Sequence, residues 1–195
     1  MNELIGIDYP IALVQSAFAE NLWPEITRRI FYARTYRNLN RQGQLIAEVY
    51  DQRGEYIEVQ FDDTYDALCF FDPDDVVNQI EEELVTTREC GIIFAVNYEN
   101  IHTLYESRVT EELYRDALKV IQDYASSLVI PNQIVAGINA YGDLSTSKLK
   151  AFNMHPWHTF RIQTTMKVDF DCNSINELSF GYEYPSPIIL SLIHI

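Results

Sequence analysis

The sequence is short of glycine, proline and cysteine, and each shortage excludes a class of protein. Seven glycines and seven prolines among 195 residues are too few for a low-complexity or collagen-like chain. The scattered glycines form neither a Gly-x-Gly-x-x-Gly nor a Walker sequence, so no phosphate-binding loop is predicted. The cysteines, Cys69, Cys90 and Cys172, are odd in number and far apart, which is not a disulfide framework. We expect them to be reduced, buried small side chains.

Basic residues are also scarce. Fourteen Lys and Arg face 29 Asp and Glu, for a net charge of −15. This charge repels phosphates and disfavours ordinary binding to nucleic acid or to an anionic membrane. It is consistent with a solvated acidic surface, with a basic protein partner, or with an acidic channel through which DNA slides without sticking.

Long apolar runs are missing as well. None approaches the ~20 residues that a bilayer span needs, and residues 1–4 carry no positive charge of the kind that precedes a secretory signal. We therefore expect neither a membrane protein nor a secreted one.

No pattern of catalytic or metal-binding residues stands out. His155-Pro156-Trp157-His158 places two imidazoles close together but supplies no further ligands, so a packed loop with a Trp anchor is the simpler interpretation. The aspartates of residues 62–75 lack the spacing of a calcium loop, and turns and helix capping explain them. No Gly-x-Ser-x-Gly elbow is present. We predict no catalytic, metal-binding or cofactor-binding residue, and no cofactor.

The first half of the chain predicts one helix and then strands. Apolar residues at helical spacing indicate a helix over 10–22, which ends at Trp23-Pro24. Residues 30–36, 44–50 and 55–61 are rich in strand-forming side chains, with a hairpin turn at 51–54. A further strand or extended arm is predicted over 64–71. In the strand at 55–61, Ile57, Val59 and Phe61 are expected to face the core.

The second half predicts helices alternating with strands. Asp72-Pro73-Asp74-Asp75 is typical of a helix start, so a helix is expected to Arg88. Residues 90–98 predict a buried strand, and 110–126 a helix. Strands are then expected over 134–141, 159–170 and 178–184. The fold class is α+β, a mostly antiparallel sheet flanked by two or three helices, with an extended hairpin and a C-terminal arm. We expect a single domain over residues 1–170 and an extension over 171–195.

The last ten residues suggest an interface, because they hold six large aliphatic side chains and no charged one. Burying each such side chain is worth ~1.5–3 kcal/mol, so we expect this segment to be covered by its own core or by another subunit. The predicted contact residues here are Ile188, Ile189, Leu190, Leu192, Ile193 and Ile195.

Six of the fourteen basic residues lie between Arg28 and Arg53, ahead of a mostly acidic stretch. This polarity fits head-to-tail docking of subunits, a strand pair with a charged solvent face, or a phosphate contact. From this region Arg28, Arg29 and Arg34 are predicted as interface residues.

The layout resembles the neck and tail-terminator (tail-completion) proteins of tailed bacteriophages. The likeness rests on Asp74-Asp75-Val76-Val77 at a helix start, on residues 89–97 as a strand and on residues 108–118 as the following helix. It implies a non-enzymatic virion protein, assembled in the host cytoplasm, that forms a homo-oligomeric ring in the connector for head–tail joining. Its implied partners are portal, neck and tail proteins, with DNA passing through the ring without specific binding.

Two other functions remain open from the residues. An acidic DNA-mimic or inhibitor protein would also carry a strong negative charge, and would need carboxylates spaced like phosphates over an exposed surface. A carboxylate-metal hydrolase built from the aspartates of residues 62–75 is a more remote alternative.

Overall fold

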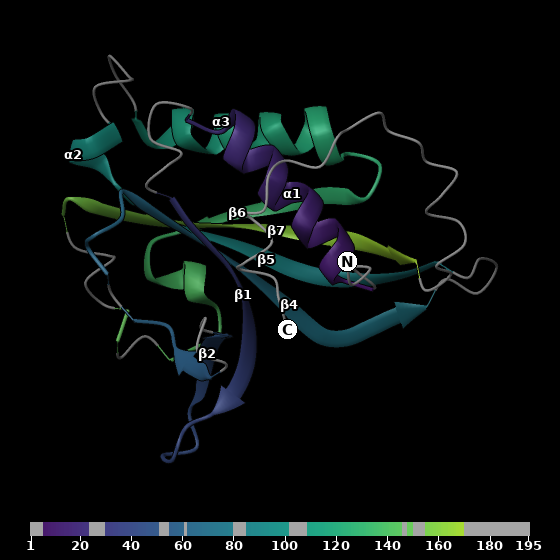
Figure 1. Ribbon diagram of the computed structural model, residues 1–195, viewed down its shortest axis with the longest axis horizontal. Coiled ribbons are helices and arrows are strands. Elements are labelled where there is room, and N and C mark those ends of the chain that lie inside the picture. The colour runs from purple at the N-terminus through teal and green to yellow at the C-terminus, as the bar shows by residue number, and fades with distance from the viewer. Residues whose placement is uncertain are drawn as a thin grey trace.

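One continuous sheet organises the part of the chain that the structure describes. The computed structural model describes residues 6–23, 30–50, 55–60, 62–79, 85–101, 109–145, 148–149 and 155–169. The sheet has seven strands in the order β3-β2-β1-β4-β5-β7-β6 (Figure 1). Adjacent strands of the sheet run antiparallel, except for β1 and β4, which run parallel. The predicted α+β class with a mostly antiparallel sheet is confirmed.

In the described residues the elements follow one another as a helix, five strands, two helices, a strand, a 3-10 helix and a last strand. Their bounds are α1 Asp8–Asn21, β1 Ile30–Leu39, β2 Leu45–Tyr50, β3 Tyr56–Glu58, β4 Ala67–Gln79, β5 Val85–Asn97, α2 Tyr98–Ile101, α3 Val109–Ala125, β6 Val129–Ala136, the 3-10 helix η3 Gly137–Tyr141 and β7 Trp157–Asp169. None of these helices is long and apolar enough to cross a bilayer.

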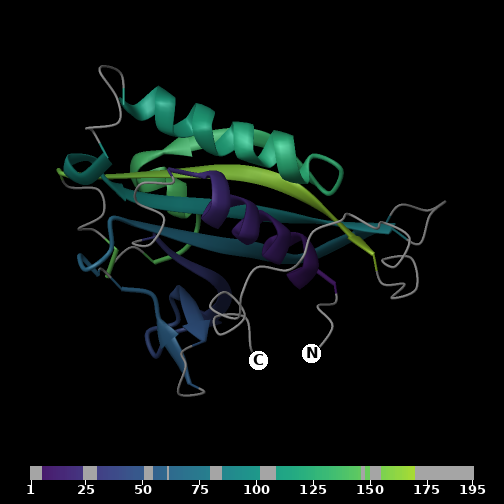
Figure 2. The same cartoon turned by 45° about the horizontal axis from the view of Figure 1, so that its top comes forward.

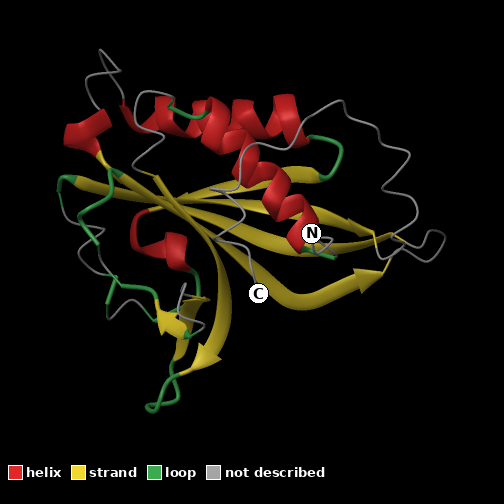
Figure 3. Cartoon of the chain, in the orientation of Figure 1, coloured by secondary structure: helices red, strands yellow, loops and turns green. Residues whose placement is uncertain are grey.

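The helices α1 and α3 lie side by side on one face of the sheet, as Figure 2 and the secondary-structure colours of Figure 3 show. We call this the helix face and the opposite one the far face. Period-two alternation along β4 and β5 sends Cys69, Phe71, Ile92 and Phe94 to the helix face. Buried positions at three- and four-residue spacing on α1, including Phe18, meet them there.

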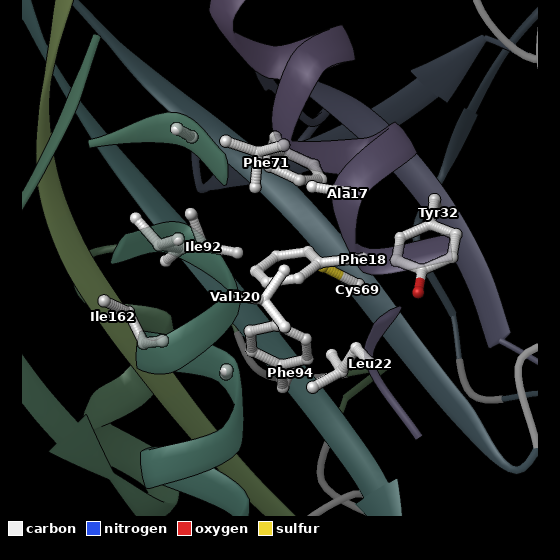
Figure 4. Packing of buried hydrophobic residues seen from close by; sticks show 14 of the residues in the cluster. Ala17, Phe18, Leu22, Tyr32, Cys69, Phe71, Ile92, Phe94, Val120 and Ile162 are labelled. Atoms are coloured by element: carbon white, nitrogen blue, oxygen red, sulfur yellow. The ribbon is translucent and has the colours of Figure 1, made fainter. Parts of the chain in front are cut away.

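The aromatic rings of this core pack closely (Figure 4). Phe94 stacks on Phe160 with ring centroids 4.8 Å apart and meets the edge of Phe18 at 5.4 Å. The thiols of Cys69 and Cys90 are free and buried, as expected, whereas Cys172 lies outside the described residues. Burial raises the pKa of both thiols, which keeps them protonated.

A second, smaller core lies on the far face. There Leu68, Phe70 and Ile93 of the sheet pack against Tyr141 at the end of η3 and against Trp157. The short helix η3 lies on the opposite side of the sheet from α1 and α3 (Figure 1). Strand β1 pairs with β4 only over Ile30–Arg34, and residues 35–39 pair with β2 alone. The hairpin of β1 and β2, with β3 at its edge, therefore bends away from the main sheet (Figures 1 and 3).

The predicted helix over 72–88 is wrong. Residues 72–79 continue β4 and residues 85–88 belong to β5. Pro73 is opposite Cys90 in the ladder, and the register shifts between Pro73 and Val77, so the proline sits beside a bulge, where strands tolerate it. Asp72, expected to cap a helix, is a buried strand residue instead. Valines at this spacing suit either structure, and pairing with β5 decides between them.

Other expectations are confirmed with shifted bounds. The helices over 10–22 and 110–126 and the strands over 30–36, 44–50, 90–98 and 159–170 match α1, α3, β1, β2, β5 and β7. The prediction of a strand over 134–141 is wrong at its C-terminal end, because residues 137–141 form η3. Val59 is buried as expected, but Ile57 is 43% exposed because β3 is the sheet edge. Residues 51–54, 61 and 170–195, including the predicted strand at 178–184 and the arm, lie outside the described residues.

Truncating Phe94 tests the helix-face core. Its side chain is fully buried against rings from α1 and β7, so Phe94→Ala is expected to lower the free energy of unfolding by ~3–5 kcal/mol in urea titrations. The control Leu39→Ala, at a side chain 64% exposed, is expected to change it by less than ~0.5 kcal/mol. Equal losses at both positions would contradict this description of the core.

Candidate functional site

A buried carboxylate, Asp72 of β4, is the centre of a group of hydrogen-bonded polar side chains on the far face. Its side chain has no solvent exposure. Arg37 of β1 donates to both of its oxygens, from Nε to Oδ1 at 2.9 Å and from Nη2 to Oδ2 at 2.8 Å. Arg161 of β7 donates from Nη1 to Oδ2 at 3.2 Å. Two guanidinium groups thus satisfy both oxygens of this buried carboxylate with charge-assisted hydrogen bonds.

Arg161 reaches Asp72 because the strand between them carries a glycine. Gly91 of β5 is paired with Asp72 on one side and with Gln163 on the other. A Cβ at position 91 would lie 2.1 Å from Cζ and Nε of Arg161, so the guanidinium occupies the space that a side chain would fill. Gly142, which follows η3 with φ +62°, also passes close to this arginine. The site therefore depends on a glycine for reasons of space, not of turn geometry.

The network continues across the sheet toward β6. Nε of Arg161 donates to Oε1 of Gln163 at 2.8 Å, and Nε2 of Gln163 donates to Glu89 at 3.3 Å. Glu89 also accepts from the Thr165 hydroxyl at 2.8 Å. Asn132 of β6 donates to Thr165 at 2.8 Å. Side chains from β1, β4, β5, β7 and β6 thus form one hydrogen-bonded row, which we call the polar stripe.

At its β1 end the polar stripe holds the hairpin against the sheet. Beyond Arg34 the backbone of β1 no longer pairs with β4. From there on, side chains of β1 make the hydrogen bonds to β4. The Thr35 hydroxyl donates to the carbonyl of Phe71 at 3.0 Å, and Arg37 carries the bidentate contact to Asp72. The hydrogen bond to Asp72 raises the pKa of Arg37 above its ordinary value. Asp143, after η3, lies 3.8 Å from the same guanidinium, so Arg37 links the hairpin, the sheet and this loop.

The chemistry open to the polar stripe is positioning rather than proton transfer. Asp72 and Glu89 each accept hydrogen bonds from several side chains of the sheet, so their oxygens are already committed to partners within the chain. Among the described residues no three His, Cys, Asp or Glu side chains converge as metal ligands would. A cavity of about 10 Å³ beside the far-face core is lined by Thr35 and apolar side chains such as Val59 and Phe70. It has room for about one water molecule.

A second polar cluster joins α3 to the sheet. His158 of β7 stacks on Tyr98 at 5.2 Å, and its Nε2 shares a 2.8 Å hydrogen bond with the Tyr114 hydroxyl. The Tyr98 hydroxyl shares a 2.6 Å hydrogen bond with Thr110 in the first turn of α3. Burial lowers the pKa of His158 and, as the main cause, raises that of Tyr114 to about 12. Trp157 is buried, as the expected Trp anchor, but the predicted loop is wrong at residues 157–158, which begin β7.

Of the predicted interface residues, the structure describes Arg34. Its Nη1 donates to Asp8 of α1, and its guanidinium lies 4.7 Å from the Tyr36 ring centroid. Arg34 thus already has partners within the chain, and its role in an interface stays a prediction. Arg28, Arg29 and the six aliphatic residues of the last ten lie outside the described residues.

Sequence reasoning missed the pairing of Asp72 with Arg37 and Arg161. A signal was present, because Asp72 and Arg161 each interrupt a run of buried strand residues. Charged side chains in such runs are buried only when paired. Which charges meet depends on the strand order, which the pattern does not contain.

No protein family, curated protein or solved structure matches this chain.

A methyl group at position 91 is expected to expel Arg161 from its place. Gly91→Ala should cost about 1–3 kcal/mol of unfolding free energy, because the guanidinium cannot stay where the new Cβ lies. In an Arg161→Ala background the same substitution should cost much less, which a double-mutant cycle of urea titrations measures. A cost that is equal in both backgrounds would show that Arg161 is not the reason for the glycine.

The His158 cluster predicts a pH dependence of stability. Because burial lowers the folded-state pKa of His158 below 6.5, the unfolded chain takes up a proton first as the pH falls. Stability should decline as the pH falls from 6.5 to the folded-state pKa, by at most ~1.4 kcal/mol per pH unit from this group.

His158→Gln should remove this part of the slope in urea titrations across that range. The matched control is His155→Gln, at an exposed histidine three residues earlier, which should leave the slope unchanged. An unchanged slope in His158→Gln would contradict the assignment.

Proposed function

We propose that this chain is a structural virion protein of a tailed bacteriophage, a subunit of a neck, connector or tail-terminator ring. In this proposal the ring joins portal and tail and lines the conduit through which DNA passes, and the chain carries out no catalysis. The proposal follows from the resemblance in the layout of the sequence. Two of the three segments on which the resemblance rests have the expected structure, since residues 89–97 lie in β5 and residues 109–118 in α3, whereas residues 74–77 lie in β4 and not at a helix start. Features of the fold add support.

The observation that carries the proposal is the hairpin of β1 and β2. It bends away from the main sheet (Figure 1), and large apolar side chains on it and on β3 are exposed: Leu39 at 64%, Tyr56 at 46% and Ile57 at 43%. An element that projects from the body and presents such side chains suits contact with another protein chain. Tyr36, Tyr50 and Tyr56 pack edge to face at its base, with centroids 5.0 and 5.2 Å apart, which stiffens it.

The polar stripe fits a structural role. Its buried charged side chains fix the angle between the hairpin and the sheet. A projecting element with a fixed orientation allows a subunit to contact its neighbours in a defined geometry. The net charge of −15 supports a conduit wall, because an acidic surface repels the DNA backbone and lets it pass.

The DNA-mimic alternative has less support. It requires carboxylates spaced like phosphates over an exposed surface, and it gives no role to the exposed apolar side chains of the hairpin and β3. Three acidic side chains of the described part are also paired within the chain. Asp8 pairs with Arg34, Glu58 with Lys148 and Glu112 with Arg115. The hydrolase alternative loses one of the aspartates of residues 62–75 as a metal ligand, since Asp72 is held by two arginines.

A particle experiment tests the proposal. Phage particles whose genome encodes this chain should contain it in a fixed copy number by quantitative mass spectrometry, and electron microscopy should place it between head and tail. A nonsense mutation in its gene should leave DNA-filled heads and separate tails, and supply of the chain in trans should restore joining. Normal particles without the chain would refute the proposal.

A further inference from the structure

The two edges of the sheet differ in length and in charge. At one edge β3 has three residues, ends in Glu58 and has a salt bridge from Lys148 to that carboxylate. At the other edge β6 has eight residues, Val129–Ala136, and none of them is charged. Proteins protect edge strands from unwanted pairing by shortness, charge, proline or bulges. The β3 edge is protected by its shortness and its charge, whereas the β6 edge is protected only over part of its length.

The protection of β6 covers its first half. Pro131 lacks an N–H, and the register against β7 shifts between Pro131 and Gln133. From Gln133 to Ala136 the strand is regular, uncharged and accessible, with Gln133 and Ala136 exposed and Ile134 and Val135 partly exposed. In a chain with 22% charged residues, this is an edge suited to accept another strand.

Apolar side chains surround this edge. Ile130, at the start of β6, is 46% exposed, and Ile138, two residues beyond its end, is 51% exposed. A strand added at β6 would cover these side chains as well as the open backbone groups. The occupant should therefore be an uncharged extended segment with aliphatic side chains on both of its faces, since an unpaired charge would be costly to bury there.

Residues 186–195 of the chain have this composition. They contain four isoleucines and two leucines, no Asp, Glu, Lys or Arg, and aliphatic residues at both odd and even positions. Isoleucine favours strands. The β3 edge of a second copy is a poorer partner for β6, because its three residues are too few to pair along the open part of that strand.

We propose that residues 186–195 of one copy add as a strand to the Gln133–Ala136 edge of β6 of a second copy. This contact would join copies head to tail, since donor and acceptor are different surfaces, and such contacts generate rings or filaments. The inference relies on the proposed function only in requiring that copies of the chain associate. It stands or falls in purified protein, without a phage particle.

Photo-crosslinking between isotopically distinct copies tests the contact. A heavy-isotope full-length chain carries p-benzoylphenylalanine in place of Gln133 and is mixed with light, unmodified chain. Mass spectrometry should find position 133 of the heavy chain joined to residues 186–195 of the light chain. The matched control carries the crosslinker in place of Gln122, an exposed glutamine on α3, and should give no such product.

Each other result overturns the proposal. Heavy-to-heavy products alone, after dilution with excess light chain, would mean that the segment adds to its own sheet. Joining of position 133 to β6 of the light chain would mean a symmetric edge-to-edge dimer. Products elsewhere, or none between copies at the highest soluble concentration, would mean that β6 does not accept this segment.

A second measurement uses charge at the edge. In sedimentation equilibrium, Gln133→Lys and Leu192→Asp should each weaken self-association by about tenfold or more, because a charge opposes strand addition. Gln122→Lys should leave self-association unchanged. Equal effects at positions 133 and 122 would overturn the proposal, and circular dichroism of each variant would show that the fold is kept.

Discussion

The buried carboxylate of Asp72 is the constraint on which the shape of this protein depends. It lies where the backbone of β1 parts from β4, and the side chains of Thr35 and Arg37 continue the attachment that main-chain pairing ends at Arg34. A buried charge is tolerated only with its partners in place. The requirement for Arg161 in turn requires Gly91 on the strand between them. One buried side chain therefore links the hairpin, the sheet and a glycine distant in sequence.

The two faces of the sheet have different structural roles. On the helix face, aromatic and aliphatic side chains pack under α1 and α3 and supply most of the burial. On the far face a smaller apolar core and the polar stripe set the position of the hairpin and of the loop after η3. Stability and geometry are thus carried by separate sets of residues, so the surfaces that project can be held in place without enlarging the main core.

Apart from Tyr124 on α3, the exposed large apolar side chains of the described residues lie near the margins of the sheet. One group is on the hairpin and β3, and the other is at the β6 edge. Their positions at opposite ends of the strand order suit an assembly in which different surfaces of identical copies meet. The proposed ring subunit and the proposed strand addition both build on this asymmetry, the first with the hairpin and the second with β6.

Local pattern alone determined the class of fold and most elements. Helical spacing located α1 and α3, and strand-forming runs located β1, β2, β5 and β7, because each of these segments buries one face in a way that its own period encodes. Tertiary structure decided the rest. Residues 72–79 became strand because β5 offered a pairing partner, Ile57 became exposed because β3 is an edge, and Asp72 met Arg37 and Arg161 because the strand order placed them side by side. Such outcomes depend on contacts between residues far apart in the chain, which no local period contains.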